Sequence, residues 1–174
     1  MEENYNMNSE KRSQNYNVLY VYNYLTKNKH VDGDFWDLGG GYKEVQESLN
    51  DFDNEDWKEL KTGILTLSEF ERYILLHSII FDFYDSFKTS FNEESFVNAG
   101  NYLLEMFYVI RDSHLRDEIA YFSSFINKSK TKPIEKLEFM KNWMLDNGYN
   151  TNEWLNSKMN PLGNIEVAIK NANK

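Results

Sequence analysis

The chain contains 174 residues, of which 41% are hydrophobic and 16% are aromatic, and it carries a net charge of −9 at pH 7. A chain of this length fits one domain that can bury roughly 68–70% of its unfolded surface. The negative charge disfavours non-specific binding to nucleic-acid phosphates or anionic membranes, and it favours a basic protein partner. The absence of cysteine excludes a disulfide scaffold, a cysteine nucleophile and a thiolate metal site.

The N-terminal segment MEENYNMNSEKR is polar and lacks the basic and apolar regions of a signal peptide. We expect residues 1–8 to form a disordered tail, followed by one helical domain over residues 9–174. The longest apolar run, Tyr73–Tyr84, is interrupted by polar residues and is too short to cross a bilayer. These features predict a soluble cytoplasmic protein that does not bind membranes.

The first predicted element is a helix over Ser9–Lys29, where apolar residues recur at helical spacing, although the run VLYVY also fits a strand. The glycine-rich run HVDGDFWDLGGGY that follows predicts a loop. Two short helices are expected next, over Tyr42–Leu49 and Asn54–Lys61, with Asn54 as the N-cap of the second. Gly63 is expected to end that helix.

The longest predicted helix is Thr66–Phe87, with the sequence TLSEFERYILLHSIIFDFYDSF. Thr66 as the N-cap and Glu69 three residues later have the spacing of a capping box. Apolar residues cover about half of the helix circumference, and Leu75 and Ile79 add apolar groups on the far side. A helix with nearly two apolar faces is expected to lie at the centre of the fold. The polar stripe that remains consists of Glu71, Ser78, Asp82, Asp85 and Ser86.

The second half of the chain carries helix start and stop signals at short intervals, and the basic loop NKSKTK lies among them. The apolar spacing at the end also leaves a strand open over Ile165–Ile169. The whole chain predicts an all-α, single compact domain of about seven or eight helices, an arrangement that stacked helical hairpins would also give. The expected signals are Asn92, Asp112 or Ser113, Pro133, Thr151 and Asn160-Pro161 as helix starts, and Asn147-Gly148 as a helix stop.

Acidic residues are concentrated in the segment 31–60, which carries a net charge of −8, whereas the part from Tyr121 onward carries +3. The aromatic residues Trp36, Phe52 and Trp57 lie within the acidic segment. Acids around aromatic side chains are typical of a surface for a basic protein, because charge steers association and buried aromatics supply affinity. The alternative is that the acids are solvated helix ends and the aromatics are core. The predicted partner-binding residues are Asp32, Asp34, Trp36, Asp37, Asp51, Asp53, Glu55 and Asp56.

The sequence contains no motif for catalysis, a metal or a cofactor. Asp32 and Asp34 match two ligand positions of a calcium-binding EF-hand loop, but an Asp stands where the loop requires glycine. The run GGGYK is too short for a phosphate-binding loop. The three histidines lie far apart, and His77, on the apolar arc of its helix, is expected to be a hydrogen-bonded core residue. We therefore expect no cofactor and no enzyme, although a site assembled from distant residues would leave no local motif.

Within Glu55–Arg72, the run DWKELKTGILTLSEFER resembles the helix pairs of small acidic bacterial immunity proteins, which neutralise polymorphic or contact-dependent toxins. This resemblance implies a cytoplasmic protein that binds one cognate toxin domain and blocks its active site, but it assigns no role to individual residues. The leading hypothesis is therefore an immunity protein for a basic toxin domain. The alternatives are a helical interaction or scaffold protein, including an acidic nucleic-acid mimic, and a small all-α enzyme.

Overall fold

The computed structural model describes residues 12–83 and 88–174 of the chain, and these residues form α-helices and one 3-10 helix but no strand. The prediction of an all-α domain is therefore confirmed. The expected tail at residues 1–8 and the expected N-cap Ser9 lie outside the described residues. The elements are α1 (Tyr16–Lys27), α2 (Gly33–Asp37), α3 (Gly41–Asn50), α4 (Asn54–Thr62), η1 (Ile64–Thr66), α5 (Glu69–Ile80), α7 (Glu93–Val109), α8 (Ser113–Tyr121), α9 (Ser123–Lys128), α10 (Ile134–Asp146), α11 (Asn152–Leu155) and α12 (Pro161–Ala172).

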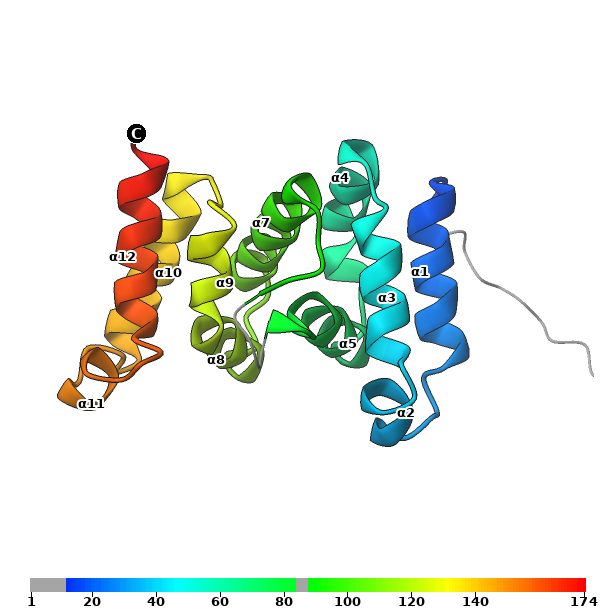
Figure 1. Cartoon of the computed structure of the whole chain (residues 1–174), viewed down its shortest axis with the longest axis horizontal. Coiled ribbons are helices and arrows are strands. Elements are labelled where there is room, and N and C mark those ends of the chain that lie inside the picture. The colour runs from blue at the N-terminus through cyan, green and yellow to red at the C-terminus, as the bar shows by residue number, and fades with distance from the viewer. Residues whose placement is uncertain (1–11, 84–87) are drawn as a thin grey trace, which may run out of the picture.

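The helices form an elongated row in which α1 and α12 lie at opposite ends (Figure 1). In this view α2 and α11 lie at the lower edge, one near each end, and α5 and α8 lie between them. Helix α7 connects the two halves because it packs against α3 and α4 on one side and against α8, α9 and α10 on the other. Helix α12 closes the far end by packing against α9, α10 and α11. The buried apolar residues accordingly form one continuous core.

Helix α5 begins two residues later than the sequence predicts. Its N-cap is Ser68, whose side chain accepts a hydrogen bond from the backbone N–H of Glu71, and Glu71 completes the capping box. The predicted cap, Thr66, belongs instead to the 3-10 turn Ile64–Thr66, where its hydroxyl donates to the carbonyl of Gly63. Ser68 and Glu71 have the same capping-box spacing as Thr66 and Glu69. The 3-10 turn contains Thr66, so Ser68 is the residue that caps the helix.

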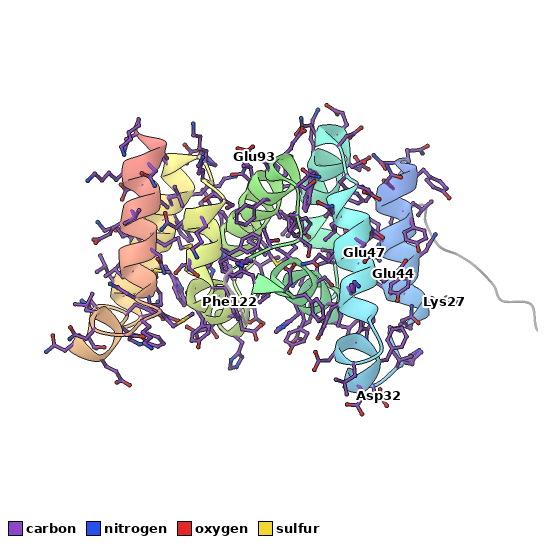
Figure 2. The ribbon with its side chains drawn as sticks, viewed as in Figure 1. Lys27, Asp32, Glu44, Glu47, Glu93 and Phe122 are labelled. Carbon is purple, nitrogen blue, oxygen red and sulfur yellow. The ribbon has the colours of Figure 1, made fainter. Side chains whose placement is uncertain are left out.

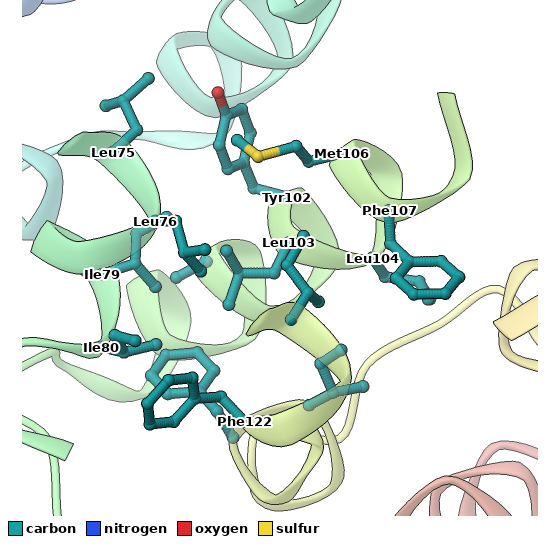
Figure 3. Close-up of a cluster of buried hydrophobic side chains, with 14 of the residues drawn as sticks. Leu75, Leu76, Ile79, Ile80, Tyr102, Leu103, Leu104, Met106, Phe107 and Phe122 are labelled. Carbon is teal, nitrogen blue, oxygen red and sulfur yellow. The ribbon is translucent and has the colours of Figure 1, made fainter. Parts of the chain in front are cut away.

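The burial of α5 also differs from the prediction. The helix ends at Ile80, and residues 84–87 of the expected helix lie outside the described residues. Ser78, expected in a polar stripe, is fully buried and donates its hydroxyl to a backbone carbonyl, whereas Tyr73 is 43% exposed and His77 is partly exposed. The deepest face of α5 meets α7 in the centre of the core. The residues labelled there in Figure 3 include Leu75, Leu76, Ile79 and Ile80 of α5 and Tyr102, Leu103, Leu104, Met106 and Phe107 of α7.

The first half of the chain contains one helix that was not predicted. Helix α1 is confirmed in place of the alternative strand, but the expected glycine-rich loop contains the short helix α2. The tight corner after α2 depends on glycine, because a Cβ on Gly41 would lie 2.7 Å from the Trp36 ring and Gly40 has a positive φ of 84°. The N-cap of α4 is Asp53, one residue before the predicted Asn54, and Asp56 completes its capping box.

Most of the predicted helix boundaries in the second half are correct. Asn92, Asp112, Thr151 and Asn160 are N-caps, and α12 is a helix in place of the alternative strand. The predicted helix after Asp112 divides at Phe122 into α8 and α9, so the basic run NKSKTK begins within α9. Helix α2 and the division into α8 and α9 add helices beyond those that the sequence predicts.

Candidate functional site

The fold divides the acidic segment between two ends of the molecule. Asp32, Asp34 and Asp37 belong to the start and body of α2, whereas Asp51, Asp53 and Glu55 lie beyond the other end of α3. Since α3 contains 10 residues, its axis separates the two groups by about 15 Å. In Figure 2 the label Asp32 marks the α2 end. The label Glu93 marks the other end, because the second group of acids lies beside the N-terminus of α7. The predicted partner surface is therefore not one surface.

The aromatic residues Trp36, Phe52 and Trp57 of the acidic segment belong to the core. Trp36 is 2% exposed, Trp57 is 3% exposed and Phe52 is 6% exposed. Trp36 packs edge-to-face against Phe35, with the ring centroids 5.3 Å apart. The prediction that Trp36 contacts a partner is therefore wrong for this structure, and the alternative that these aromatics are core is correct.

Asp56 is also inaccessible, with 4% of its surface exposed. Its carboxylate accepts hydrogen bonds from the Nδ2 atoms of Asn15, at 2.5 Å, and Asn17, at 2.8 Å. These bonds attach the start of α1 to α4. The buried carboxylate therefore has a structural role, and its predicted contact with a partner is wrong for this structure.

The remaining acids differ in whether the protein itself uses them. Asp32 caps α2 by accepting from the backbone N–H of Phe35, and Asp53 caps α4. Glu55 pairs with Lys58 on the surface of α4 at 3.2 Å. By contrast, Asp34 and Asp37 are exposed, and neither carboxylate has a hydrogen bond or ion pair with another described residue.

Two neighbouring clefts on the face that holds α2, α5 and α8 share His77. The first cleft has a volume of about 870 Å³ and lies between α2, α3 and α5. The second has a volume of about 730 Å³ and lies between α5, α8 and the residues before and within α11. Phe122, labelled in Figure 2 near α8, lines the second cleft. We refer to the two clefts together as the His77 groove. Its acidic lining residues are Asp34, Asp37, Asp82, Asp117 and Glu118, and its aromatic lining residues are Tyr42, Tyr73, Phe81, Tyr121, Phe122, Tyr149 and Trp154.

His77 contacts residues on both sides of the groove. Its Nε2 atom lies 3.3 Å from Oε1 of Glu118 on α8. Its ring centroid lies 4.1 Å from that of Tyr73, one turn earlier on α5, and 5.7 Å from that of Tyr42 on α3. The prediction that His77 is hydrogen-bonded is consistent with this contact. The prediction that it is a core residue is wrong, because 24% of its side chain is exposed.

Burial raises the pKa values of two tyrosines in the groove, and the nearby acids raise them further. Burial raises the pKa of Tyr42 to about 12, and the neighbouring Tyr73, Asp37 and Glu118 add to the increase. Burial also raises the pKa of Tyr149, whose hydroxyl donates to Oδ1 of Asp117 at 3.0 Å. None of the described residues that line the two clefts is Lys or Arg. The groove therefore combines negative charge with apolar aromatic surface.

Another acidic cleft, separate from the His77 groove, has a volume of about 530 Å³ and lies at the other end of α3, around Asp51, Asp53 and Glu55. Hydrogen bonds cross it, because the backbone N–H of Asn92 donates to Oδ1 of Asn50 at 2.7 Å. Its aromatic lining residue, Phe52, is 6% exposed. This cleft therefore offers charge but little apolar surface to a partner.

The described residues contain no group of three or more His, Asp or Glu residues placed to hold a metal ion. His77 and Glu118 form the kind of pair that can act as a general base, but no Ser or Thr is among the described lining residues of the groove.

Comparisons of the chain with protein-family models, curated protein sequences and solved structures find no significant match. No helix among the described residues is both long enough and apolar enough to span a membrane. The function is therefore inferred from the chemistry of the groove.

Proposed function

We propose that the protein is a cytoplasmic binding protein that holds a basic region of a partner protein in the His77 groove. The proposed partner is a toxin domain that the protein neutralises, so its role is that of an immunity protein. One observation carries this proposal. The groove is lined by five acids and seven aromatic residues, with no Lys or Arg among its described lining residues.

The acidic and the aromatic lining residues of the groove would act at different stages of binding. Negative charge attracts a basic partner over long distances and raises the association rate, and it suppresses binding of acidic competitors. Aromatic side chains that lose water on contact supply much of the affinity in protein interfaces. A toxin domain whose basic active-site region lay in the groove would be unable to reach its own substrate. This form of inhibition requires no catalytic residue in the inhibitor.

The test is rescue of growth. The C-terminal domain of the protein encoded beside this chain would be expressed in a bacterial host, with and without this protein, and surviving cells would be counted. We expect the domain to be toxic alone and harmless when this protein is present. Toxicity without rescue would rule out an immunity role for that partner, and the scaffold hypothesis would then be preferred.

Paired variants connect rescue to the groove. The double variant Asp34→Asn/Asp37→Asn removes two charges from the groove, and Asp51→Asn/Glu55→Gln removes two charges from the other end of α3. All four residues are exposed, so both variants are expected to fold. We expect rescue to fail or weaken only with the groove variant. Equal loss of rescue in both variants would show that overall charge, and not the groove, determines binding.

A further inference from the structure

The cleft between α2, α3 and α5 has the two features that a cationic side chain requires. Its exposed carboxylates, Asp34 and Asp37, have no hydrogen bond or ion pair with other described residues. A third carboxylate, Asp82, is held in place by a hydrogen bond from Nε2 of Gln46 at 2.9 Å. The cleft is thus acidic on both the α2 side and the α5 side.

An aromatic wall lies beside these carboxylates. The ring of His77 lies between Tyr73, at a centroid distance of 4.1 Å, and Tyr42, at 5.7 Å. Phe81 extends the wall, with its centroid 6.1 Å from that of Tyr42. The faces of aromatic rings attract cations, and the attraction increases as water is removed. The wall therefore places ring surface suited to a cation beside the carboxylates.

The same combination already holds an arginine elsewhere in this molecule. The guanidinium of Arg12 lies 4.5 Å from the ring centroid of Tyr22 and pairs with the carboxylate of Glu71 at 2.5 Å. Arg116 shows the ring contact without a carboxylate: it lies 5.3 Å from the ring centroids of both Phe107 and Phe139 and donates to backbone carbonyls. Each arginine is supplied by the chain itself. The α2–α3–α5 cleft has comparable walls but no Lys or Arg among its described lining residues.

We propose that this cleft receives one arginine side chain of the partner, which stacks on Tyr73 and pairs with Asp34 and Asp37. This inference rests on the proposed function and names the chemistry of the partner's anchor residue. Arginine is favoured over lysine because its planar guanidinium stacks on rings and directs five N–H donors toward several carboxylates. The ammonium of lysine is a compact, strongly hydrated charge that lacks this geometry.

The test uses short peptides and needs no toxin. Three capped pentapeptides, identical except for a central Arg, Lys or citrulline, would be titrated into the full chain labelled with ¹⁵N. We expect the arginine peptide to shift amide resonances of α2, α3 and the Tyr73–His77 turn of α5, and to bind about threefold more tightly than the lysine peptide. Citrulline has nearly the same shape without charge, so its peptide should produce no saturable shift.

Matched tyrosine variants test the aromatic wall. Tyr73 and Tyr20 are each 43% exposed, but only Tyr73 lines the cleft. Tyr73→Leu should weaken binding of the arginine peptide by about threefold to fivefold, because the cation–ring attraction is lost. Tyr20→Leu should leave it unchanged. Equal effects of the two variants would overturn the assignment of the wall.

The outcomes separate this inference from the proposed function. If the arginine peptide gives no saturable shift, or binds no better than the lysine or citrulline peptide, the arginine site is wrong, even if the protein rescues cells from the toxin. If the arginine peptide binds at the cleft but no toxin is neutralised, the site is supported and the immunity role fails. Shifts confined to residues outside α2, α3 and α5 would also contradict the inference.

Discussion

The two ends of α3 carry similar numbers of acids, but the fold uses more of those at the α4 end. Around α4, Asp53 and Asp56 form a capping box, and Asp56 also binds the start of α1. Around α2, Asp34 and Asp37 have no such donors among the described residues and lie beside aromatic rings. Charge density in a sequence therefore does not locate a binding surface. The informative difference is whether the fold already supplies hydrogen-bond donors to each carboxylate.

The largest effect should come from removing a carboxylate that the fold uses. Asp56→Ala leaves the side chains of Asn15 and Asn17 without their acceptor and breaks the capping box. We expect a loss of about 3 kcal/mol in the free energy of unfolding, because hydrogen bonds to buried charges are strong. Unfolding in urea would measure this loss. Asp51→Ala, at an exposed acid of the same segment, should change the free energy by less than about 0.5 kcal/mol. Similar losses in both variants would contradict the comparison.

A second structural carboxylate, Glu71, should make stability depend on acid pH. Burial alone raises the pKa of Glu71, but hydrogen bonds from Arg12 and Ser68 outweigh it, and the net pKa is lowered from 4.5. A lowered pKa means that the stabilisation is complete above about pH 4.5 and disappears as pH falls through the folded-state pKa. Glu71→Gln should cost about 2 kcal/mol at neutral pH.

Unfolding in urea at several pH values would test the role of Glu71. The difference between the parent protein and Glu71→Gln should shrink as the pH falls below about 4.5. As a control, Glu69→Gln changes an exposed acid in the same first turn of α5. This control should follow the parent protein closely at each pH. A difference between parent and Glu71→Gln that stays constant down to the lowest pH would show that ionisation of Glu71 does not stabilise the fold.

Charges without internal partners should affect association and not stability. Asp34→Asn/Asp37→Asn should slow association with a basic partner by about tenfold at low salt, because electrostatic steering is weakened. The difference from the parent should decrease as salt is added. Stopped-flow mixing at several salt concentrations would measure both effects. If Asp51→Asn/Glu55→Gln slowed association as much, the groove would have no special role.

The helix starts could be predicted because their signals are local. Asn92, Asp112 and Thr151 each precede a helix within a few residues, and the structure places all three as N-caps. The His77 groove could not be predicted in this way. His77 and Glu118 are 41 residues apart in the chain, and they meet only when the fold brings α5 and α8 together. The sequence showed the charge of the acidic segment but not which of its carboxylates receive hydrogen bonds.

The orientation of α5 could not be predicted from the sequence either. Its apolar residues cover so much of the circumference that periodicity could not decide which side faces the core. In the fold, Leu75 and Ile79 are completely buried, whereas Tyr73 is 43% exposed. This orientation of α5 places the rings of Tyr73 and His77 in the groove. The glycine run after α2 predicts only a loop, but Gly41 packs against Trp36 and fixes the start of α3.

The smallest expected effect is a change in the titration of Tyr42. Its pKa is raised to about 12, first by burial and then by nearby charges that include Asp37. Asp37→Asn should lower the Tyr42 pKa by a few tenths of a unit, because a nearby negative charge disfavours the tyrosinate. Ring resonances of Tyr42 followed by NMR at increasing pH would report this shift. Asp51→Asn, at the far end of α3, should leave the Tyr42 pKa unchanged. Equal shifts in both variants would mean that net charge, and not the local field of the groove, controls this tyrosine.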